Sequence, residues 1–390
     1  MFKSFFLGGF EGSTGFNRHR QRIDQVRATQ HDRFADEDYL LLNRVGIRAV
    51  RESVRWPLVD FSGKYDFSTL EPFLSAAEKH DIEIVYDLFH FGYPEYVDLC
   101  SADFPRRFAD YCYAAADYLS GYRHLGSTFA PINEPSFFSW AAGDAGLFAP
   151  HLTCRGRELK INLIRAAIVG IDAIRSAFPQ AHIVNIDPIC RVVAPLNRPD
   201  LQDDADSFND NAVFEAWDML SGRLLPELGG SPNHLGIIGI NYYWTNQWEL
   251  GKQGVPLEDD DPRRWSLGEL VRTVWERYGA EMVITETGHV GNMRPIWLQE
   301  LSREAENVIR DGLPLNGVCL YPVLGMPEWH QPEEWTQMGL WDLKLSGEKL
   351  KRVPYEPVIR ALREAQRVER LKLGGQKIFP YCEFISTSLE

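Results

Sequence analysis

The chain has 390 residues, of which 44% are hydrophobic and 25% charged, so it can bury a large core. Disorder, collagen-like repeats and coiled coils are excluded as overall descriptions. Lysine plus arginine number 41 and aspartate plus glutamate 55, which gives a formal net charge of −14. Because nucleic-acid binding relies on clustered basic side chains, this balance argues against a nucleic-acid partner.

Cysteine usage and the N-terminal sequence bear on the compartment. The six cysteines are scattered and form no CxxC pair, so neither a zinc site nor a redox motif is predicted. The apolar run at residues 4–10 is too short and too rich in glycine for a secretory signal, and no stretch of 18 apolar residues is present. We therefore expect a cytoplasmic protein with reduced cysteines, no membrane contact, no metal and no cofactor.

Short apolar runs alternate with longer amphipathic stretches along most of the chain. The runs predict eight strands, at residues 5–10, 49–54, 83–90, 128–133, 182–187, 235–243, 282–287 and 317–323. The amphipathic stretches predict eight helices, at residues 36–44, 70–80, 104–119, 158–178, 208–220, 267–278, 296–310 and 355–368. Near-continuous apolar runs of this length are typical of strands buried on both faces, as in a parallel sheet.

Eight successive βα units predict an α/β fold, the (β/α)8 or TIM barrel. An open doubly wound sheet is the alternative, but it seldom needs eight evenly spaced units. No linker divides the chain, and the polar stretches at residues 197–206 and 251–264 are expected to be loops. We expect one domain over residues 1–370 and a C-terminal tail over residues 371–390.

Two of the predicted strands end in a glutamate, and functional side chains of such barrels lie at the carboxyl ends of the strands. The fourth strand ends in NEP, with Glu134, and the seventh in ETG, with Glu286. Two carboxyl groups at one barrel mouth are the equipment of glycoside hydrolysis. One donates a proton to the leaving oxygen, and the other attacks the anomeric carbon or activates water. Each short motif is weak alone, and the joint placement carries the hypothesis.

INEP at 132–135 and ITETG at 284–288 resemble the (T/L)NEP and ITENG motifs of glycoside hydrolase family 1. This β-glucosidase-like family belongs to a barrel clan with its acid/base on strand four and its nucleophile on strand seven. The likeness extends from about residue 5 to residue 341. It implies that Glu134 is the acid/base, that Glu286 is the nucleophile, and that the protein is a retaining, exo-acting β-glycosidase.

Two further motifs imply groups that orient the nucleophile. VRESVRW at 50–56 resembles the family's YRFSISW, which makes Arg51 the partner of the nucleophile. An arginine inside a buried strand must in any case find a carboxylate. GINYYW at 239–244 resembles GxNYY, so Tyr243 would donate to the nucleophile with Asn241 nearby as a substrate contact.

The resemblance also implies substrate contacts. LFHFGYP at 88–94 resembles LxHWDLP, which makes His90 a sugar contact, although a lone histidine on an apolar strand can also be a core residue. Asn133 would bond the sugar 2-hydroxyl, a contact that strengthens at the transition state. YPVLGMPEW at 321–329 has the length of WSLLDNFEW and places Tyr321, Glu328 and Trp329 in the substrate site. A carboxylate at Glu328 would repel a sugar 6-phosphate, which favours an unphosphorylated sugar.

Three departures from the family pattern alter the predicted sugar pocket. Gly9 stands where relatives carry glutamine, Tyr321 replaces the first tryptophan of the last motif, and Phe91 replaces the tryptophan after the histidine. The identity of the sugar therefore cannot be carried over from the family.

Alternative functions remain open at this point. Another hydrolase of the same clan, such as an endo-glucanase or mannanase, also carries NEP and a strand-seven glutamate. A non-catalytic sugar-binding protein is a second alternative, against which both carboxylates argue. A metal-dependent barrel hydrolase would carry His-x-His after the first strand, and this motif is absent. In each case the partner is a carbohydrate, and the oligomeric state is left open.

Overall fold

In the computed structural model, which describes residues 2–372, eight parallel strands close into a barrel. Each strand pairs with the next barrel strand along the chain, and the last pairs with the first. In chain order they are β1 (Phe6–Gly9), β4 (Ala49–Ser53), β5 (Glu83–Asp87), β6 (Thr128–Ala130), β7 (His182–Pro188), β9 (Ile237–Asn241), β11 (Met282–Thr287) and β12 (Leu315–Leu320). The predicted (β/α)8 barrel is confirmed, with strand ends that differ by a few residues.

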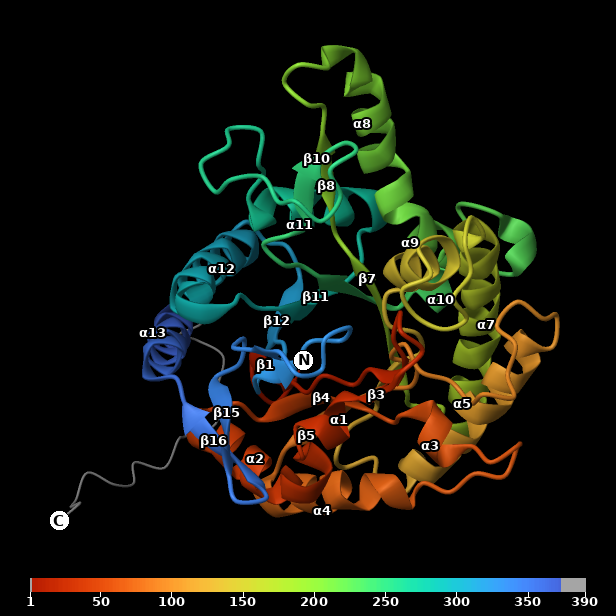
Figure 1. Cartoon of the computed structure of the whole chain (residues 1–390), viewed down its shortest axis with the longest axis vertical. Helices are drawn as coiled ribbons and strands as arrows, with labels where there is room; N and C mark the ends of the chain where they lie inside the picture. The colour runs from red at the N-terminus through yellow and green to blue at the C-terminus, as the bar shows by residue number, and fades with distance from the viewer. Residues whose placement is uncertain (1, 373–390) are drawn as a thin grey trace.

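Helices surround the barrel, as Figure 1 shows. The longer ones are α2 (His31–Arg44), α4 (Glu71–His80), α5 (Phe104–Ser120), α7 (Gly156–Ala177), α11 (Leu267–Tyr278), α12 (Arg294–Arg310) and α13 (Glu356–Lys372). Short helices are α1 (Gln25–Ala28), α3 (Trp56–Val59), α6 (Pro135–Phe138), α8 (Gln202–Asp210), α9 (Glu215–Leu220) and α10 (Pro232–Leu235). The tail expected over residues 371–390 lies outside the described residues except for 371 and 372, which belong to α13.

Within residues 2–372, four small two-stranded sheets lie outside the barrel sheet. They pair β2 (Thr14–Phe16) with β3 (Arg22–Asp24), β8 (Arg191–Val193) with β10 (Gln247–Glu249), β13 (Met326–Pro327) with β14 (Trp335–Thr336), and β15 (Trp341–Ser346) with β16 (Lys349–Pro354). The pair β8–β10 and helix α8 project from one side of the barrel, at the top of Figure 1.

The alternation of side chains along each barrel strand builds two separate cores. Residues that point inward fill the barrel with a cluster that includes Leu7, Ala49, Val85, Val283 and Cys319. Their neighbours along the strands point outward and join the larger core beneath the helices. Burial on both faces explains why these strands read as continuous apolar runs rather than as alternating ones.

One predicted helix and one predicted loop are wrong. The helix expected at residues 208–220 is broken, because Asn211 leaves the helical conformation, with φ −124° and ψ −61°. The stretch 197–206, expected to be a loop, contains the start of α8. The acidic residues that made this stretch look like a loop, Asp203 and Asp204, lie in the first helical turn, where the helix dipole favours negative charge.

A buried charge cluster fixes the second barrel strand against its helix. His31 of α2 lies 2.7 Å from both Asp38 of α2 and Glu52 of β4, and its ring stacks on Phe10. Arg352 of β16 bonds Asp38 from the other side at 2.6 Å. Burial acts to lower the pKa of His31, but the two carboxylates outweigh it and raise the pKa to about 9. The cluster thereby holds β4 in place, and Arg51 is the residue of β4 that directly precedes Glu52.

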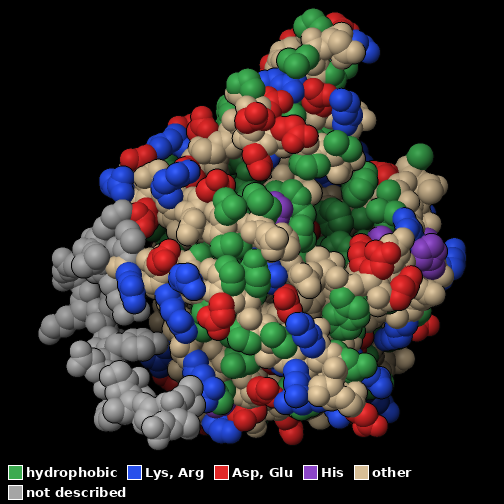
Figure 2. Space-filling model, turned by 60° about the vertical axis from the view of Figure 1, so that its left-hand side comes forward, with side chains coloured by type: hydrophobic (Ala, Val, Ile, Leu, Met, Phe, Trp, Pro, Cys, Tyr) green, Lys and Arg blue, Asp and Glu red, His purple; other side chains and the backbone are tan. Residues whose placement is uncertain are grey.

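The surface carries both acidic and basic side chains, as the composition of the sequence implies. Acidic and basic side chains are interspersed on the face in Figure 2, which also shows a hollow walled mainly by hydrophobic side chains. Within residues 2–372 no helix combines the length and hydrophobicity that crossing a bilayer requires. The five cysteines in the same part of the chain carry free thiols.

Candidate active site

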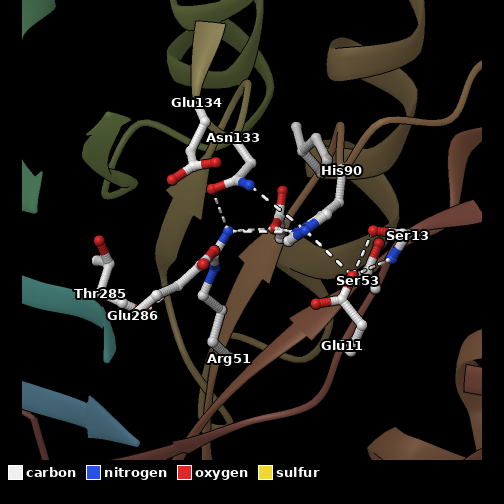
Figure 3. Close-up of polar contacts among 12 residues, drawn as sticks. Glu11, Ser13, Arg51, Ser53, His90, Asn133, Glu134, Thr285 and Glu286 are labelled. Atoms are coloured by element: carbon white, nitrogen blue, oxygen red, sulfur yellow. Dashed lines mark hydrogen bonds and ion pairs between the residues drawn. The ribbon is translucent and has the colours of Figure 1, made fainter. Parts of the chain in front are cut away.

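Polar side chains from five strands converge at the carboxyl end of the barrel, as Figure 3 shows in part. Arg51 belongs to β4, Asn241 ends β9 and Glu286 lies near the end of β11. His90 follows β5 by three residues, and Glu134 follows β6. All five side chains are buried. Parallel closure of the sheet brings these ends together, so residues far apart in sequence meet here.

Arg51 lies at the centre of the cluster. One terminal nitrogen donates to Glu286 Oε1 at 2.6 Å, and the other donates to Asp87 Oδ2 at 2.6 Å and to Asn133 Oδ1 at 2.7 Å. Burial acts to lower the pKa of the guanidinium, but Asp87 and then Glu286 outweigh it and hold the pKa well above its usual range. Arg51 is therefore a permanent cation with a fixed fork of donors.

Glu286 has a donor for each of its oxygens. Oε1 accepts from Arg51, and Oε2 accepts from the Tyr243 hydroxyl at 2.9 Å. Two donors, one of them a cation, suit an ionised carboxylate. The two orienting contacts implied by the resemblance are thus present in the structure.

Glu134 lies in a different environment. Its Oε1 accepts from Asn241 Nδ2 at 2.9 Å, and its backbone has a φ of +48°, a left-handed conformation that is rare for residues with a side chain and recurs at functional sites. Burial, and next the negative charge of Glu286, raise the pKa of Glu134 well above its usual value, and the bond from Asn241 only partly opposes them. Glu134 therefore retains its proton where an ordinary glutamate would not.

Asn241 joins the surroundings of the two glutamates. Its Nδ2 donates to Glu134 and, at 3.3 Å, approaches Asn133 Oδ1, while its Oδ1 accepts from the Thr285 hydroxyl at 2.7 Å. Thr285 directly precedes Glu286 on β11. Asn241 therefore contacts Glu134 directly and, through the Thr285 hydroxyl, the residue next to Glu286 on β11.

Three buried residues of the cluster were not predicted from the sequence: Asp87, Glu11 and Thr285. His90 Nδ1 lies 2.9 Å from Asp87 Oδ2, and its Nε2 lies 3.5 Å from Glu11 Oε1. Burial acts to lower the pKa of His90, but Glu11 and Asp87 outweigh it and raise the pKa. Asp87 ends β5, but the strand predicted from the sequence continues to residue 90, so no strand-end signal marked this carboxylate.

Tyr321 occupies the space above Gly9. Its ring lies parallel to that of His90 at 6.0 Å, and its hydroxyl accepts from the backbone N–H of Gly12 at 3.2 Å. A Cβ atom on Gly9 would lie 2.1 Å from Cδ2 of Tyr321, which no packing allows. The glycine and the tyrosine, two of the departures from the family pattern, are therefore one structural arrangement.

Glu328 and Trp329, from the motif at residues 321–329, make different kinds of contact. Glu328 turns back on its own loop, where its Oε2 accepts from the backbone N–H groups of His330 and Gln331 at 2.6 and 3.1 Å. Trp329 packs edge-on against Phe91, with 5.9 Å between ring centroids. The indole N–H of Trp329 is buried and has no hydrogen-bond partner among residues 2–372.

Aromatic side chains flank both glutamates. Phe137 of α6, three residues after Glu134, contacts Trp329 at 6.2 Å and Trp140 at 5.9 Å between centroids. On the other side Trp244, next to Tyr243, stacks on His289 at 4.3 Å. These partly exposed rings offer flat apolar faces of the kind that pack on sugar rings.

No group of three or more histidine, cysteine, aspartate or glutamate side chains within residues 2–372 is arranged to hold a metal ion. Two carboxyl groups of the cluster lie in contrasting surroundings: Glu286 is bonded to the Arg51 cation, and Glu134 to the neutral amide of Asn241.

No protein-family model and no curated protein sequence matches the chain. Solved structures do. The AHE enzyme from Alicyclobacillus herbarius superposes with a TM-score of 0.75 at 18% identity, over 94% of this chain and 98% of that one. The family 1 β-glucosidase from Thermotoga maritima gives 0.73 at 16% identity, over 94% and 98%. The Thermotoga β-glucosidase bound to glucoimidazole gives 0.74 at 15%, over 94% and 97%. At these identities the likeness establishes the shared (β/α)8 barrel.

Replacing Arg51 by methionine is expected to lower the free energy of unfolding by about 3–5 kcal/mol, because it leaves the buried carboxylates of Asp87 and Glu286 without their cation. Arg272→Met is the control, since the pair Arg272–Asp311 is exposed and worth under about 1 kcal/mol. Urea unfolding at neutral pH measures both. Equal losses in the two variants would contradict the central role of Arg51.

Proposed function

We propose that the protein is a retaining, exo-acting β-glycosidase that hydrolyses a β-linked, unphosphorylated sugar. The observation that carries the proposal is the contrast between two buried carboxyl groups at one barrel mouth. Glu286 meets a cation and a hydroxyl donor, whereas the pKa of Glu134 is raised by burial and by Glu286 itself. Such a pair supplies a nucleophile and an acid at the same pH.

In the first step Glu286 attacks the anomeric carbon while Glu134 gives its proton to the departing oxygen, and a glycosyl–enzyme ester forms. In the second step Glu134, now ionised, takes a proton from water, which attacks the same carbon and releases Glu286. Arg51 and Tyr243 orient the nucleophile throughout. In this proposal Asn133 bonds the sugar 2-hydroxyl, and His90 a further hydroxyl.

The sugar end of the site supports exo-action. Tyr321, His90 and Glu11 are buried side by side, and in the proposed site they form its closed end, which suits a terminal sugar better than a chain that passes through. A carboxylate at Glu11 disfavours a phosphorylated sugar. The similar Thermotoga structures are those of a family 1 β-glucosidase and of a β-glucosidase in complex with deoxynojirimycin and with glucoimidazole, which supports the same substrate class.

A panel of 4-nitrophenyl β-glycosides tests the proposed function, with proton NMR to identify the anomer released first. We expect release of nitrophenol from at least one unphosphorylated glycoside, with the β-anomer as the first product. An α-anomer released first would refute the retaining mechanism. Cleavage of internal bonds in β-glucan or β-mannan, without action on any aryl glycoside, would favour the endo-acting alternative. A sugar-binding protein would bind but cleave nothing.

Replacing Glu286 by glycine should abolish turnover, because no nucleophile remains. Added azide should partly restore cleavage of the aryl glycoside by attack from the vacated side, giving an α-glycosyl azide. Product NMR identifies the azide. The exposed Glu276 of α11 gives the control, and Glu276→Gly should keep full activity. Absence of azide rescue, in a variant that folds and binds, would move the nucleophile elsewhere.

Replacing Glu134 by alanine should slow glycosides with poor leaving groups by about 10²–10⁴-fold, since these need the proton. Activated dinitrophenyl glycosides should lose far less in formation of the glycosyl–enzyme, and azide should give a β-glycosyl azide. Stopped-flow release of the phenol separates the two steps. Equal slowing of activated and unactivated substrates would contradict the acid role.

A further inference from the structure

Asp187, on β7, lies behind the segment that carries Glu134. Its Oδ1 accepts from the backbone N–H of Ser136 at 3.0 Å, and the carbonyl of Ile186 accepts from the N–H of Glu134 at 3.0 Å. Two successive residues of β7 thus hold both ends of the turn from residue 134 to 136. Asp187 is entirely buried, and it was not among the site residues predicted from the sequence.

The second oxygen of Asp187 is in an unusual situation. Among the described residues Asp187 Oδ2 makes no hydrogen bond of normal geometry, although the Ser136 hydroxyl is close enough to lower the pKa of Asp187. The adjoining cavity measures about 10 Å³ and has mostly apolar walls, among them Ile132, Pro135 and Trp217. This volume is at the lower limit for one water molecule, so at most one water can reach the carboxyl group, which is therefore poorly hydrated. A proton on Oδ2 is the alternative way to stabilise the group.

The charges around Asp187 do not cancel this effect. Burial raises the pKa of Asp187 to about 7, Ser136 and Lys160 oppose the rise, and Glu215 adds to it. Lys160 of α7 is itself bonded to Glu215 of α9 at 2.7 Å, and Arg157 of α7 bonds the same carboxylate. The partly buried Cys190 thiol lies within electrostatic range of both Asp187 and Glu134.

We propose that Asp187 is a positioning residue for Glu134, which it serves in two ways. Its bond to Ser136 fixes the turn that aims the Glu134 carboxyl group, and its negative charge favours the protonated form of Glu134. The proposal rests on the acid role of Glu134. Burial and the charge of Glu286 raise the pKa of Glu134 first, and Asp187 adds to them once it is ionised, above about pH 7.

Asp187→Asn separates charge from shape, because the amide oxygen still accepts from Ser136 and only the charge is lost. The titration of Glu134 is followed by ¹³C NMR of protein labelled at glutamate side-chain carboxyls, with the Glu134 signal assigned by its absence in Glu134→Gln. In Asp187→Asn the midpoint should fall by about half to one pH unit. The alkaline limb of kcat/KM for a 4-nitrophenyl glycoside should move down by the same amount. Asp117→Asn, on the exposed face of α5, should change neither.

Asp187→Ala removes the bond as well as the charge. It should show the same fall in midpoint and, in addition, a lower kcat on glycosides with poor leaving groups, which Asp187→Asn retains at acid pH. If neither variant folds, the parent protein still decides: its Glu134 signal should show a second inflection near pH 7, where Asp187 ionises.

An unshifted Glu134 midpoint in Asp187→Asn, or a single inflection in the parent protein, would overturn the proposal. The NMR result does not depend on activity. A shifted midpoint in a protein that cleaves no glycoside would leave the coupling intact and refute the glycosidase. Cleavage with an unshifted midpoint would do the reverse.

Discussion

The arrangement of the site depends on one buried cation. Arg51 is 2% exposed and is bonded to two carboxylates and one amide oxygen that come from three other strands or their ends. A guanidinium in the centre of a barrel is tolerable only if its neighbours neutralise it, and carboxylates in the same place are tolerable only if it is there. Glu286, Asp87 and Asn133 are therefore held by the need to keep this charge paired, and the geometry of the site follows from that need.

The pairing of Arg51 also gives the two glutamates different electrostatic environments. Arg51 is bonded to Glu286 and not to Glu134, whose only side-chain donor is the neutral amide of Asn241 within the hydrogen bonds described here. Once Glu286 is a stable anion, its field raises the proton affinity of Glu134. Burial of Glu134, together with the contact that Arg51 makes with Glu286 alone, thus places the two identical side chains in contrasting environments. Sequence adjacency plays no part, because the two are 152 positions apart (286 minus 134).

The features of the fold and the site that the sequence could predict are those that leave a local pattern in it. Barrel strands bury both faces, and the resulting apolar runs are local patterns, so the strands and the closed barrel were predictable. The two glutamates were found because each lies next to the end of such a run. Asp87 ends β5, but the apolar run in the sequence continues to residue 90, so only its 2.6 Å contact with Arg51 identifies it as part of the site. The break at Asn211 and the start of α8 at Gln202 escaped because acidic residues in a first turn resemble a loop. The orientation of Glu328, set by two backbone donors in its own loop, has no sequence signature at all.

The packing of Tyr321 over Gly9 restricts which substitutions this pocket can accept one at a time. With the tyrosine ring in its present place, no side chain fits at position 9, since its Cβ would lie 2.1 Å from the ring. A larger residue at position 9 therefore requires either that the ring leaves its place beside His90 or that a different residue stands at position 321. Truncating the ring leaves a cavity, which costs about 3–5 kcal/mol but keeps the backbone intact, whereas the overlap does not. The shape of this pocket is thus set by the two positions together.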